Sequence, residues 1–248
     1  MNSVALVTGG SRGIGRATAI LLAQQGYAVG VNYLNNKTAA QSVVDEIQQA
    51  GGKAIALQAD IADETQVVAM FKRLGEELGT ITALVNNAGI LFQQTTIENL
   101  SAERINKVLS TNLTGYFLCC REAVKIMSHR HGGKGGTIVN VSSAAARLGA
   151  PGEYVDYAAS KGAVDTLTTG LALEVAAYGI RVNCVRPGLI YTEMHASGGE
   201  PGRVDRVKAN LPMQRGGQPE EVAQAIYWLL SDSSSYVTGS FLDLAGGR

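Results

Sequence analysis

Tyr157 and Lys161 are the two residues whose types and spacing most directly indicate catalysis. Four positions apart in a segment of helical period, they share one helix face and lie one turn from each other. A free tyrosine has a pKa of about 10, too high for a good base near neutral pH. A nearby ammonium favours the phenolate, so we expect Lys161 to lower the pKa of Tyr157 and to make its hydroxyl useful for proton exchange.

Two serines, Ser142 and Ser143, precede this pair at the end of the apolar segment Thr137–Val141. A serine hydroxyl at a strand end can bind a substrate oxygen and stabilise the charge that develops there. We assign this role to Ser143, with Ser142 as the alternative. A Tyr-x-x-x-Lys pair alone is common on ordinary helix surfaces, so its meaning depends on the motifs around it.

A glycine-rich turn, Thr8–Gly15, follows a segment of strand type and opens a segment of helical period. Glycine lets the backbone turn tightly and approach a pyrophosphate, and the N-terminus of the following helix attracts phosphate. The glycines at 9, 13 and 15 give GxxxGxG rather than the common GxGxxG. We predict a dinucleotide site here, the alternative being a plain strand-to-helix turn.

The end of the second expected strand indicates which dinucleotide would bind. NAD sites usually have an acidic residue there, which binds the ribose hydroxyls, whereas this strand ends in Asn32-Tyr33. Arg12 lies in the glycine turn, Lys37 follows the strand, and a guanidinium can bind a 2′-phosphate through two hydrogen bonds. We therefore favour NADP(H), with NAD(H) possible, while Arg12 could instead be a solvated loop residue.

Two further strand ends carry candidate cofactor contacts. Asp60 either accepts a hydrogen bond from an adenine amino group or caps the helix that starts near Asp63. In Asn86–Gly89 the asparagines can bind nearby backbone, and Ala-Gly leaves room for a ligand. The same segment could also be a structural turn that supports the sheet, and this is compatible with a ligand contact.

These motifs must be positioned by an alternation of strands and helices. Segments dense in Val, Ile, Leu and Ala between helices predict a parallel sheet covered on both faces, and right-handed crossovers make it an α/β doubly wound (Rossmann) sheet. Every motif lies at the carboxyl end of a strand, where such sheets bind ligands. The expected strands are Val4–Thr8, Ala28–Asn32, Ala54–Gln58, Ala83–Asn86, Thr137–Val141, Arg181–Val185 and Ser240–Leu244, and the expected helices run to about Gln25 and over Lys37–Ala50, Glu64–Leu78, Ala102–Met127, Tyr157–Tyr178 and Pro219–Ser231.

The composition favours one domain over residues 1–248, with 46% hydrophobic and 17% charged residues and no linker or repeat. The formal net charge of +0 argues against nucleic acid and anionic membranes as partners, and no apolar run approaches the length of a membrane span. Cys119, Cys120 and Cys184 show no CxxC spacing, so we expect reduced, buried thiols, no metal site and a cytoplasmic protein.

Taken together, the sequence resembles the short-chain dehydrogenase/reductase family. The motifs that carry the resemblance are Thr8–Gly15, Asn86–Gly89, Asn112, Ser143, Tyr157 with Lys161, and Pro187-Gly188. The resemblance implies hydride transfer between a nicotinamide and a carbonyl or alcohol carbon of a small molecule, of the glucose 1-dehydrogenase or 3-oxoacyl-acyl-carrier-protein (ACP) reductase type. It implies that Tyr157 is the general acid or base, that Lys161 also holds the nicotinamide ribose, and that Ser143 orients the carbonyl. It also implies that Asn112 holds a water that relays protons, the alternative being that Asn112 marks a simple helix irregularity.

The resemblance also implies a homotetramer, assembled through the helix from Tyr157 and the helix before it. Two positions depart from the family pattern: Ser143 precedes Tyr157 by 14 residues rather than 13, and Ala245 replaces the usual Asp before the paired glycines. The implied cofactor contacts are Gly9, Ser11, Arg12, Gly13, Ile14, Gly15, Asn32, Asp60, Ile61, Asn87, Ala88, Gly89, Tyr157, Lys161, Pro187, Gly188, Ile190 and Thr192.

The segment from about 188 to 218 is the expected substrate loop, and its glycines suit either a mobile lid that excludes water or a passive surface loop. We expect His195 to be an exposed loop residue, the alternative being that it lines the substrate pocket with Met194, and we expect Tyr154 to line the substrate loop. Two other classes of protein compete with an enzyme of this family. A non-catalytic NADP-binding regulator should lack Tyr157 or Lys161, and a methyltransferase should have an acidic residue after the second strand.

Overall fold

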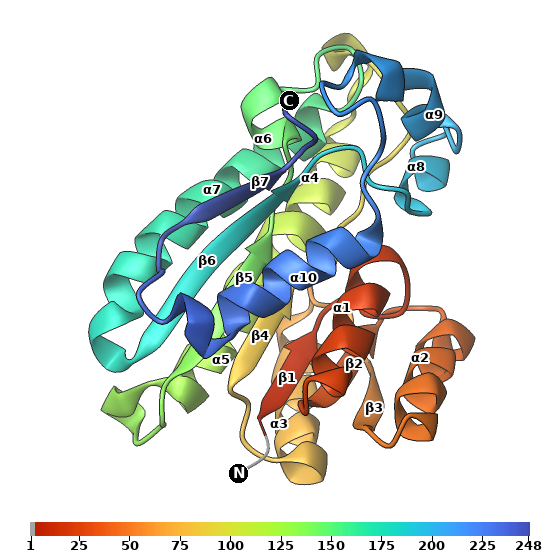
Figure 1. Ribbon diagram of the computed structural model, residues 1–248. Coiled ribbons are helices and arrows are strands. Elements are labelled where there is room, and N and C mark those ends of the chain that lie inside the picture. Colours follow the sequence, from red (N-terminus) through yellow and green to blue (C-terminus); the bar gives the residue numbers. More distant parts are fainter. Residues whose placement is uncertain (1–2) are drawn as a thin grey trace.

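A computed structural model describes residues 3–248, so the first two residues of the predicted domain lie outside the described part of the chain. Seven parallel strands form one sheet in the order β3-β2-β1-β4-β5-β6-β7 (Figure 1). The strand order reverses between β1 and β4, which is where sheets of this type bind ligands. The strands are β1 Val4–Val7, β2 Ala28–Tyr33, β3 Lys53–Gln58, β4 Ala83–Asn86, β5 Gly136–Val141, β6 Ile180–Pro187 and β7 Phe241–Leu244.

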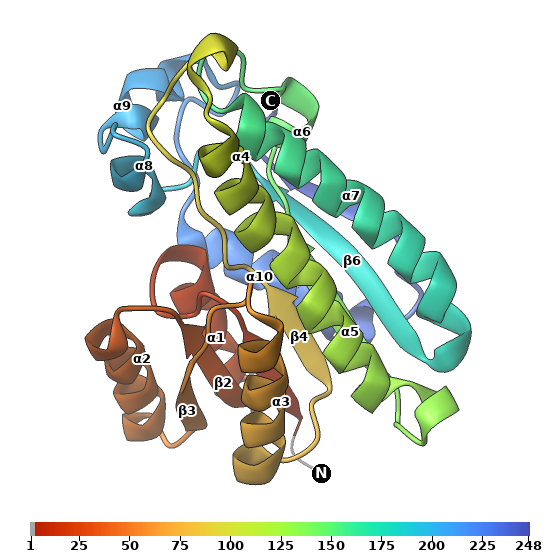
Figure 2. The ribbon, with the colours of Figure 1, turned by 180° about the vertical axis from the view of Figure 1, so that it is seen from behind.

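Helices cover both faces of the sheet, as Figures 1 and 2 show from opposite sides. One face is covered by α1, α2 and α10, and the other by α3, α4, α5 and α7, so the predicted doubly wound sheet is confirmed. The helices are α1 Gly13–Gln24, α2 Lys37–Gln49, α3 Glu64–Leu78, α4 Ala102–Leu109, α5 Gly115–Met127, α6 Ala145–Leu148, α7 Val155–Val175, α8 Met194–Ser197, α9 Arg203–Val207 and α10 Pro219–Leu230, with shorter turns at Ile97–Asn99, His129–His131, Ala176–Tyr178, Lys208–Asn210 and Asp232–Ser234.

The central strands are apolar on both sides because each side faces a helix layer. Successive residues of a strand point to opposite faces. Accordingly, Leu6 packs in the core on the side of α3, α5 and α7, whereas its neighbours Ala5 and Val7 pack on the side of α1, α2 and α10. All four residues of β1 are buried. This double burial is why the strand segments lack polar alternation in the sequence.

The segment Ala102–Met127 was expected as one α-helix, and this is wrong in its middle. The structure has α4, a π-helical turn over Ser110–Thr114, and then α5. The Gly115 N–H bonds the Ser110 carbonyl, five residues back. One-turn π segments of this kind are frequent at functional sites, and this one contains Asn112, which has no accessible surface.

Short helices gather over the carboxyl ends of the strands. Figure 1 shows α6, α8 and α9 at that end, beside the C-terminus. The predicted loop after β6 is therefore partly helical, with α8 and α9 inside it. None of the helices formed by residues 3–248 is long and apolar enough to cross a membrane. The three cysteines are free and buried.

Candidate active site

Tyr157 lies in the wall of a cavity of about 370 Å³ at the carboxyl end of the sheet. It stands in the first turns of α7, two residues after the helix begins, and only 8% of its surface is exposed. Ser143, two residues past β5, lines the same cavity, and its hydroxyl counts among the influences that lower the pKa of Tyr157. The predicted phenol and serine hydroxyl therefore meet at one hollow.

Lys161 lies one turn further along α7 and is 2% exposed. Its Nζ donates to the Val141 carbonyl at 2.7 Å and to the Tyr116 Oη at 3.2 Å. The Nζ is 5.0 Å from the centre of the Tyr116 ring and 5.7 Å from that of Tyr157. The ammonium thus sits between two phenols and is hydrogen-bonded to the inner one.

Tyr116 is a member of this group that the sequence did not indicate. It follows the π turn on α5, has no accessible surface, and its Oη donates to the Val141 carbonyl at 3.1 Å. Its position in the helix resembles that of any core aromatic, so only the three-dimensional contact with Lys161 identifies it.

Burial determines the protonation of both residues. The pKa of Tyr157 is raised by burial, which outweighs the hydrogen bond from Ser143 and the charge of Arg203. Lys161 is not among the groups that lower this pKa, so the expected downward shift is wrong in direction. Burial also lowers the pKa of Lys161 to about 8, against the opposing influence of Cys184 and Asp165. Near neutral pH the phenol keeps its proton and the amine its charge.

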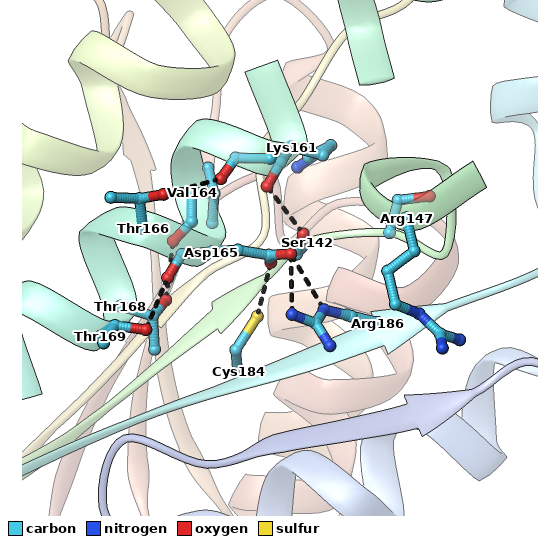
Figure 3. Close-up of polar contacts among 12 residues, drawn as sticks. Ser142, Arg147, Lys161, Val164, Asp165, Thr166, Thr168, Thr169, Cys184 and Arg186 are labelled. Carbon is cyan, nitrogen blue, oxygen red and sulfur yellow. Dashed lines mark hydrogen bonds and ion pairs between the residues drawn. The ribbon is translucent and has the colours of Figure 1, made fainter. Parts of the chain in front are cut away.

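The two candidate serines have different surroundings. Ser142 is buried and its Oγ donates to the Lys161 carbonyl at 3.0 Å, so it holds the backbone of α7 (Figure 3). Ser143 lines the cavity. The geometry therefore favours Ser143 as the serine that contacts substrate, and the 14-residue spacing to Tyr157 is absorbed by α6 and the turn after it.

A second set of contacts joins α7 to the neighbouring strand (Figure 3). Asp165, one turn after Lys161, accepts from the Arg186 Nε at 3.0 Å, and the Cys184 thiol lies 3.7 Å from the same carboxylate. Arg186 and Cys184 both belong to β6. The helix that carries Tyr157 and Lys161 is thus anchored to both β5 and β6.

Asn112 is fully engaged by its neighbours. Its Oδ1 accepts from the Ile90 N–H at 2.8 Å, and its Nδ2 donates to the Ile90 carbonyl at 2.9 Å and to the Ser160 Oγ at 3.1 Å. Ser160 in turn donates to the Tyr157 carbonyl. The amide therefore ties the segment after β4 to α7. Because these bonds occupy the Asn112 side chain, a water that relays protons would have to bind the main chain of the π turn, and this role of Asn112 stays a prediction.

The glycine turn packs directly on the segment that follows β4. A Cβ at Gly9, whose φ is +60°, would lie 2.9 Å from the Ala88 Cα. A Cβ at Gly15 would lie 2.2 Å from the Gly9 carbonyl oxygen. The Asn87 Nδ2 donates to the carbonyls of Thr8 and Gly9 at 3.0 and 3.1 Å. Both motifs meet at the point where the strand order reverses, and Asn87 supports the turn in addition to any contact with a ligand.

Arg12 and Asn32 differ in their freedom to bind a ligand. Arg12 is exposed, and its guanidinium makes no hydrogen bond or ion pair with residues 3–248. Asn32 is 2% exposed. Its Oδ1 accepts from the Gly9 N–H, and its Nδ2 donates to the carbonyls of Leu57 and Ala59. Asn32 thus holds the glycine turn against β3, and these bonds disfavour the predicted contact of its side chain with a cofactor.

The remaining predicted cofactor residues lie at the same edge of the sheet. The helix after β3 is capped by Asp63 and not by Asp60, whose Oδ1 accepts from the Ala62 N–H. Beyond β6, Thr192 contacts the glycine turn, since a Cβ at Gly13 would lie 3.2 Å from its Cγ2. A cleft of about 470 Å³ is lined by Gly13 of the glycine turn, by Thr192 and by Val204 of α9.

Two residues near the cavity can be compared with their predictions. Tyr154 is 3% exposed and lines the cavity, as expected of a residue near the substrate loop. His195 was expected to be exposed, and this is wrong: it is half-buried, lines the same cavity, and its Nε2 lies 2.9 Å from the Ile190 carbonyl oxygen. Burial is the main cause that lowers the pKa of His195.

Comparison with known proteins gives matches over nearly the whole chain. A family profile described as enoyl-(acyl carrier protein) reductase matches residues 9–248. A protein of Escherichia coli (strain K12) named uncharacterized oxidoreductase YgfF is 76% identical and covers 99% of this chain and 100% of its own length. A 3-oxoacyl-[acyl-carrier-protein] reductase of Synechocystis sp. is 42% identical, covering 98% of this chain and 96% of its own.

Solved structures agree with these matches. A short chain dehydrogenase from Burkholderia cenocepacia J2315, solved in complex with NADP, superimposes with a TM-score of 0.89 at 35% identity, over 99% of this chain and 97% of its own. A dehydrogenase/reductase from Sinorhizobium meliloti 1021 gives a TM-score of 0.90 at 36% identity, over 99% of this chain and 94% of its own. At these identities the likeness extends beyond the fold alone.

Proposed function

The chain belongs to the short-chain dehydrogenase/reductase family, and from this premise we propose that it is an NADP(H)-dependent oxidoreductase acting on a carbonyl or alcohol carbon. The observation that carries the proposal is the meeting of Tyr157 and Ser143 in one cavity wall, with the buried Lys161 one turn behind. NADP(H), when bound, supplies the hydride for reduction and accepts it in oxidation.

The residues at the glycine turn fit a phosphate-rich cofactor. Helix α1 has no side-chain cap and no acidic residue in its first turn, so its N–H groups are available to an anion. Gly9 to Gly15 would hold the pyrophosphate, and the unpartnered Arg12 would bind a 2′-phosphate. The NADP complex of the Burkholderia relative supports the choice of NADP(H).

In reduction, Tyr157 would give its proton to the substrate oxygen. Its raised pKa keeps the phenol protonated near neutral pH, which suits an acid better than a base. Ser143 would donate a hydrogen bond to the same oxygen and hold it beside the phenol. Lys161 would hold the nicotinamide ribose, the other role that the resemblance implies for it. In the oxidative direction the raised pKa is a disadvantage, because the phenol must lose its proton before it can act as the base.

Replacement of Tyr157 tests this mechanism. We expect Tyr157→Phe to lower kcat at least about a hundredfold, while NADPH binding, followed by nucleotide fluorescence, persists. Tyr154→Phe, which removes a phenol hydroxyl from the same cavity, is the matched control and should retain most activity. Unchanged turnover in Tyr157→Phe would contradict the proposed mechanism, and loss of NADPH binding in that variant would indicate a misfolded site.

The substrate is best sought with a panel that follows NADPH absorbance. General carbonyl compounds are the first class of substrate to test. The 42% identity to a 3-oxoacyl-[acyl-carrier-protein] reductase makes 3-oxoacyl thioesters the second. Sugars test a glucose 1-dehydrogenase-like activity, and aldehydes and ketones test general carbonyl reduction. A non-catalytic NADP-binding regulator is less well supported because Tyr157 and Lys161 are both present, and it would reduce nothing in the panel.

A further inference from the structure

The cavity beside Tyr157 has a guanidinium in its wall. Arg203, the first residue of α9, lines the cavity together with Ser143 and Tyr157, and its Cζ lies 5.2 Å from the centre of the Tyr154 ring. Its side chain is only 16% exposed. A charged group with so little access to water is uncommon unless it is paired or has a function.

Within residues 3–248, the Arg203 side chain has one hydrogen-bonding partner. Its Nη2 donates to the carboxylate of Glu153, whose side chain is 30% exposed and so more open to water than the guanidinium. The Arg203 Nε is buried and has no hydrogen-bond partner. Buried donors without a partner are rare in native proteins and ask for an explanation. Glu153 therefore leaves part of the hydrogen-bonding capacity of this guanidinium unused.

The charge of Arg203 reaches the reacting group. It opposes the rise in the pKa of Tyr157, and it contributes to the lowered pKa of His195. At His195 the charge of Glu200 opposes that of Arg203. At the phenol, where a substrate oxygen would lie, the Arg203 charge favours negative charge. A negatively charged substrate group is favoured beside such a guanidinium.

We propose that Arg203 binds a carboxylate of the substrate, and that the enzyme prefers carbonyl compounds that carry a carboxylate over neutral ones. This inference rests on the proposed reductase function. Guanidinium and carboxylate match in geometry and form two parallel hydrogen bonds. Glu153 already binds this guanidinium through one nitrogen, Nη2, and a substrate carboxylate would share or replace that contact. Leu91, Leu148 and Leu211 line the same cavity and would enclose the carbon chain.

Matched pairs of acid and methyl ester test the preference. The probes are 4-oxopentanoate and 4-formylbenzoate, each beside its methyl ester, with NADPH oxidation giving kcat and KM. We expect kcat/KM for the acid to exceed that for the ester by at least about tenfold. Equal efficiencies, or a preference for the esters, would overturn the carboxylate proposal and leave carbonyl reduction intact. If neither member of a pair is reduced and the acids give no protection against thermal unfolding, both proposals fail.

Substitutions assign the preference to Arg203. Arg203→Met should raise KM for the acids about 10- to 100-fold and change KM for the esters less than about threefold. Arg203→Lys should restore part of the acid preference. Lys208→Met, which removes the same charge from the same segment at an exposed residue paired with Asp205, should leave the ratio unchanged. A parallel loss for acid and ester in Arg203→Met would show a structural role only and overturn the proposal.

Glu153→Gln provides an independent test that does not remove the guanidinium. It keeps the shape of the side chain and removes the charge that competes with the substrate. We expect the KM for the acids to fall several-fold while the KM for the esters stays the same. A rise in KM for the acids would contradict the view that Glu153 occupies the position of a substrate carboxylate.

Discussion

Lys161→Met should make the folded protein more stable while it inactivates the enzyme. The buried amine has a pKa of about 8 in place of 10.5, so holding it charged near pH 7 costs about 3 kcal/mol relative to the unfolded chain. Methionine fills similar space without charge. Loss of the two hydrogen bonds to Val141 and Tyr116, at about 1 kcal/mol each, offsets about 2 kcal/mol of this gain. A net stabilisation of about 1 kcal/mol is expected near neutral pH.

The sign of the pH dependence separates this explanation from others. The folded-state pKa of Lys161 is below the unfolded value, so the penalty is complete below pH 8 and disappears as pH rises from 8 to 10.5. The free energy of unfolding of the variant relative to wild type should therefore fall by about 2 kcal/mol between pH 7 and pH 9.5, from a small advantage to a small deficit. Urea denaturation at one fixed protein concentration measures both quantities. A variant no more stable than wild type, or a difference independent of pH, would refute the reasoning.

Other predictions concern the cofactor, the amine and the assembly. Arg12→Ala should weaken NADPH binding about tenfold or more and NADH binding little, and equal losses by fluorescence titration would remove the case for NADP(H). Tyr116→Phe removes one hydrogen-bond acceptor of the Lys161 ammonium. The alkaline limb of the pH profile of kcat for reduction, expected near pH 8, should therefore move to lower pH while NADPH affinity is unchanged. An unmoved limb would mean that Tyr116 only fills space. Leu173 on α7 is 81% exposed, in keeping with the expected homotetramer, and light scattering that gives a monomer at micromolar concentration would contradict it.

The doubly wound sheet could be predicted from the sequence because fully apolar segments that alternate with segments of helical period are typical of a parallel sheet covered on both faces. The failures have identifiable physical causes. The π turn at Ser110–Thr114 has the same hydrophobic period as an α-helix, so it is invisible in the pattern. Spacing along α7 places Lys161 near Tyr157, yet it says nothing of desolvation, and burial reverses the sign of the pKa shift of Tyr157.

The residues that the sequence singled out by motif lie at one edge of the sheet: the glycines of the turn, and Tyr157 with Lys161. The sequence did not single out Arg203, because arginines are common in polar loops. Only the three-dimensional structure places Arg203 of α9 in the cavity wall. His195 was misjudged for the same reason, since its burial depends on the path of a segment whose local sequence resembles a surface loop.

The bonds of Asn32 limit how the cofactor preference of this enzyme can evolve. An aspartate at this position would keep the acceptor for the Gly9 N–H, but it would set a carboxylate oxygen against the carbonyls of Leu57 and Ala59. The residue that most directly distinguishes the two dinucleotides in other proteins is thus unavailable for a single-step change. A lineage that evolves towards NAD would have to acquire its acidic residue at an exposed neighbour such as Leu34 or Asn35. Asn32 would be retained because its bonds hold the glycine turn in place.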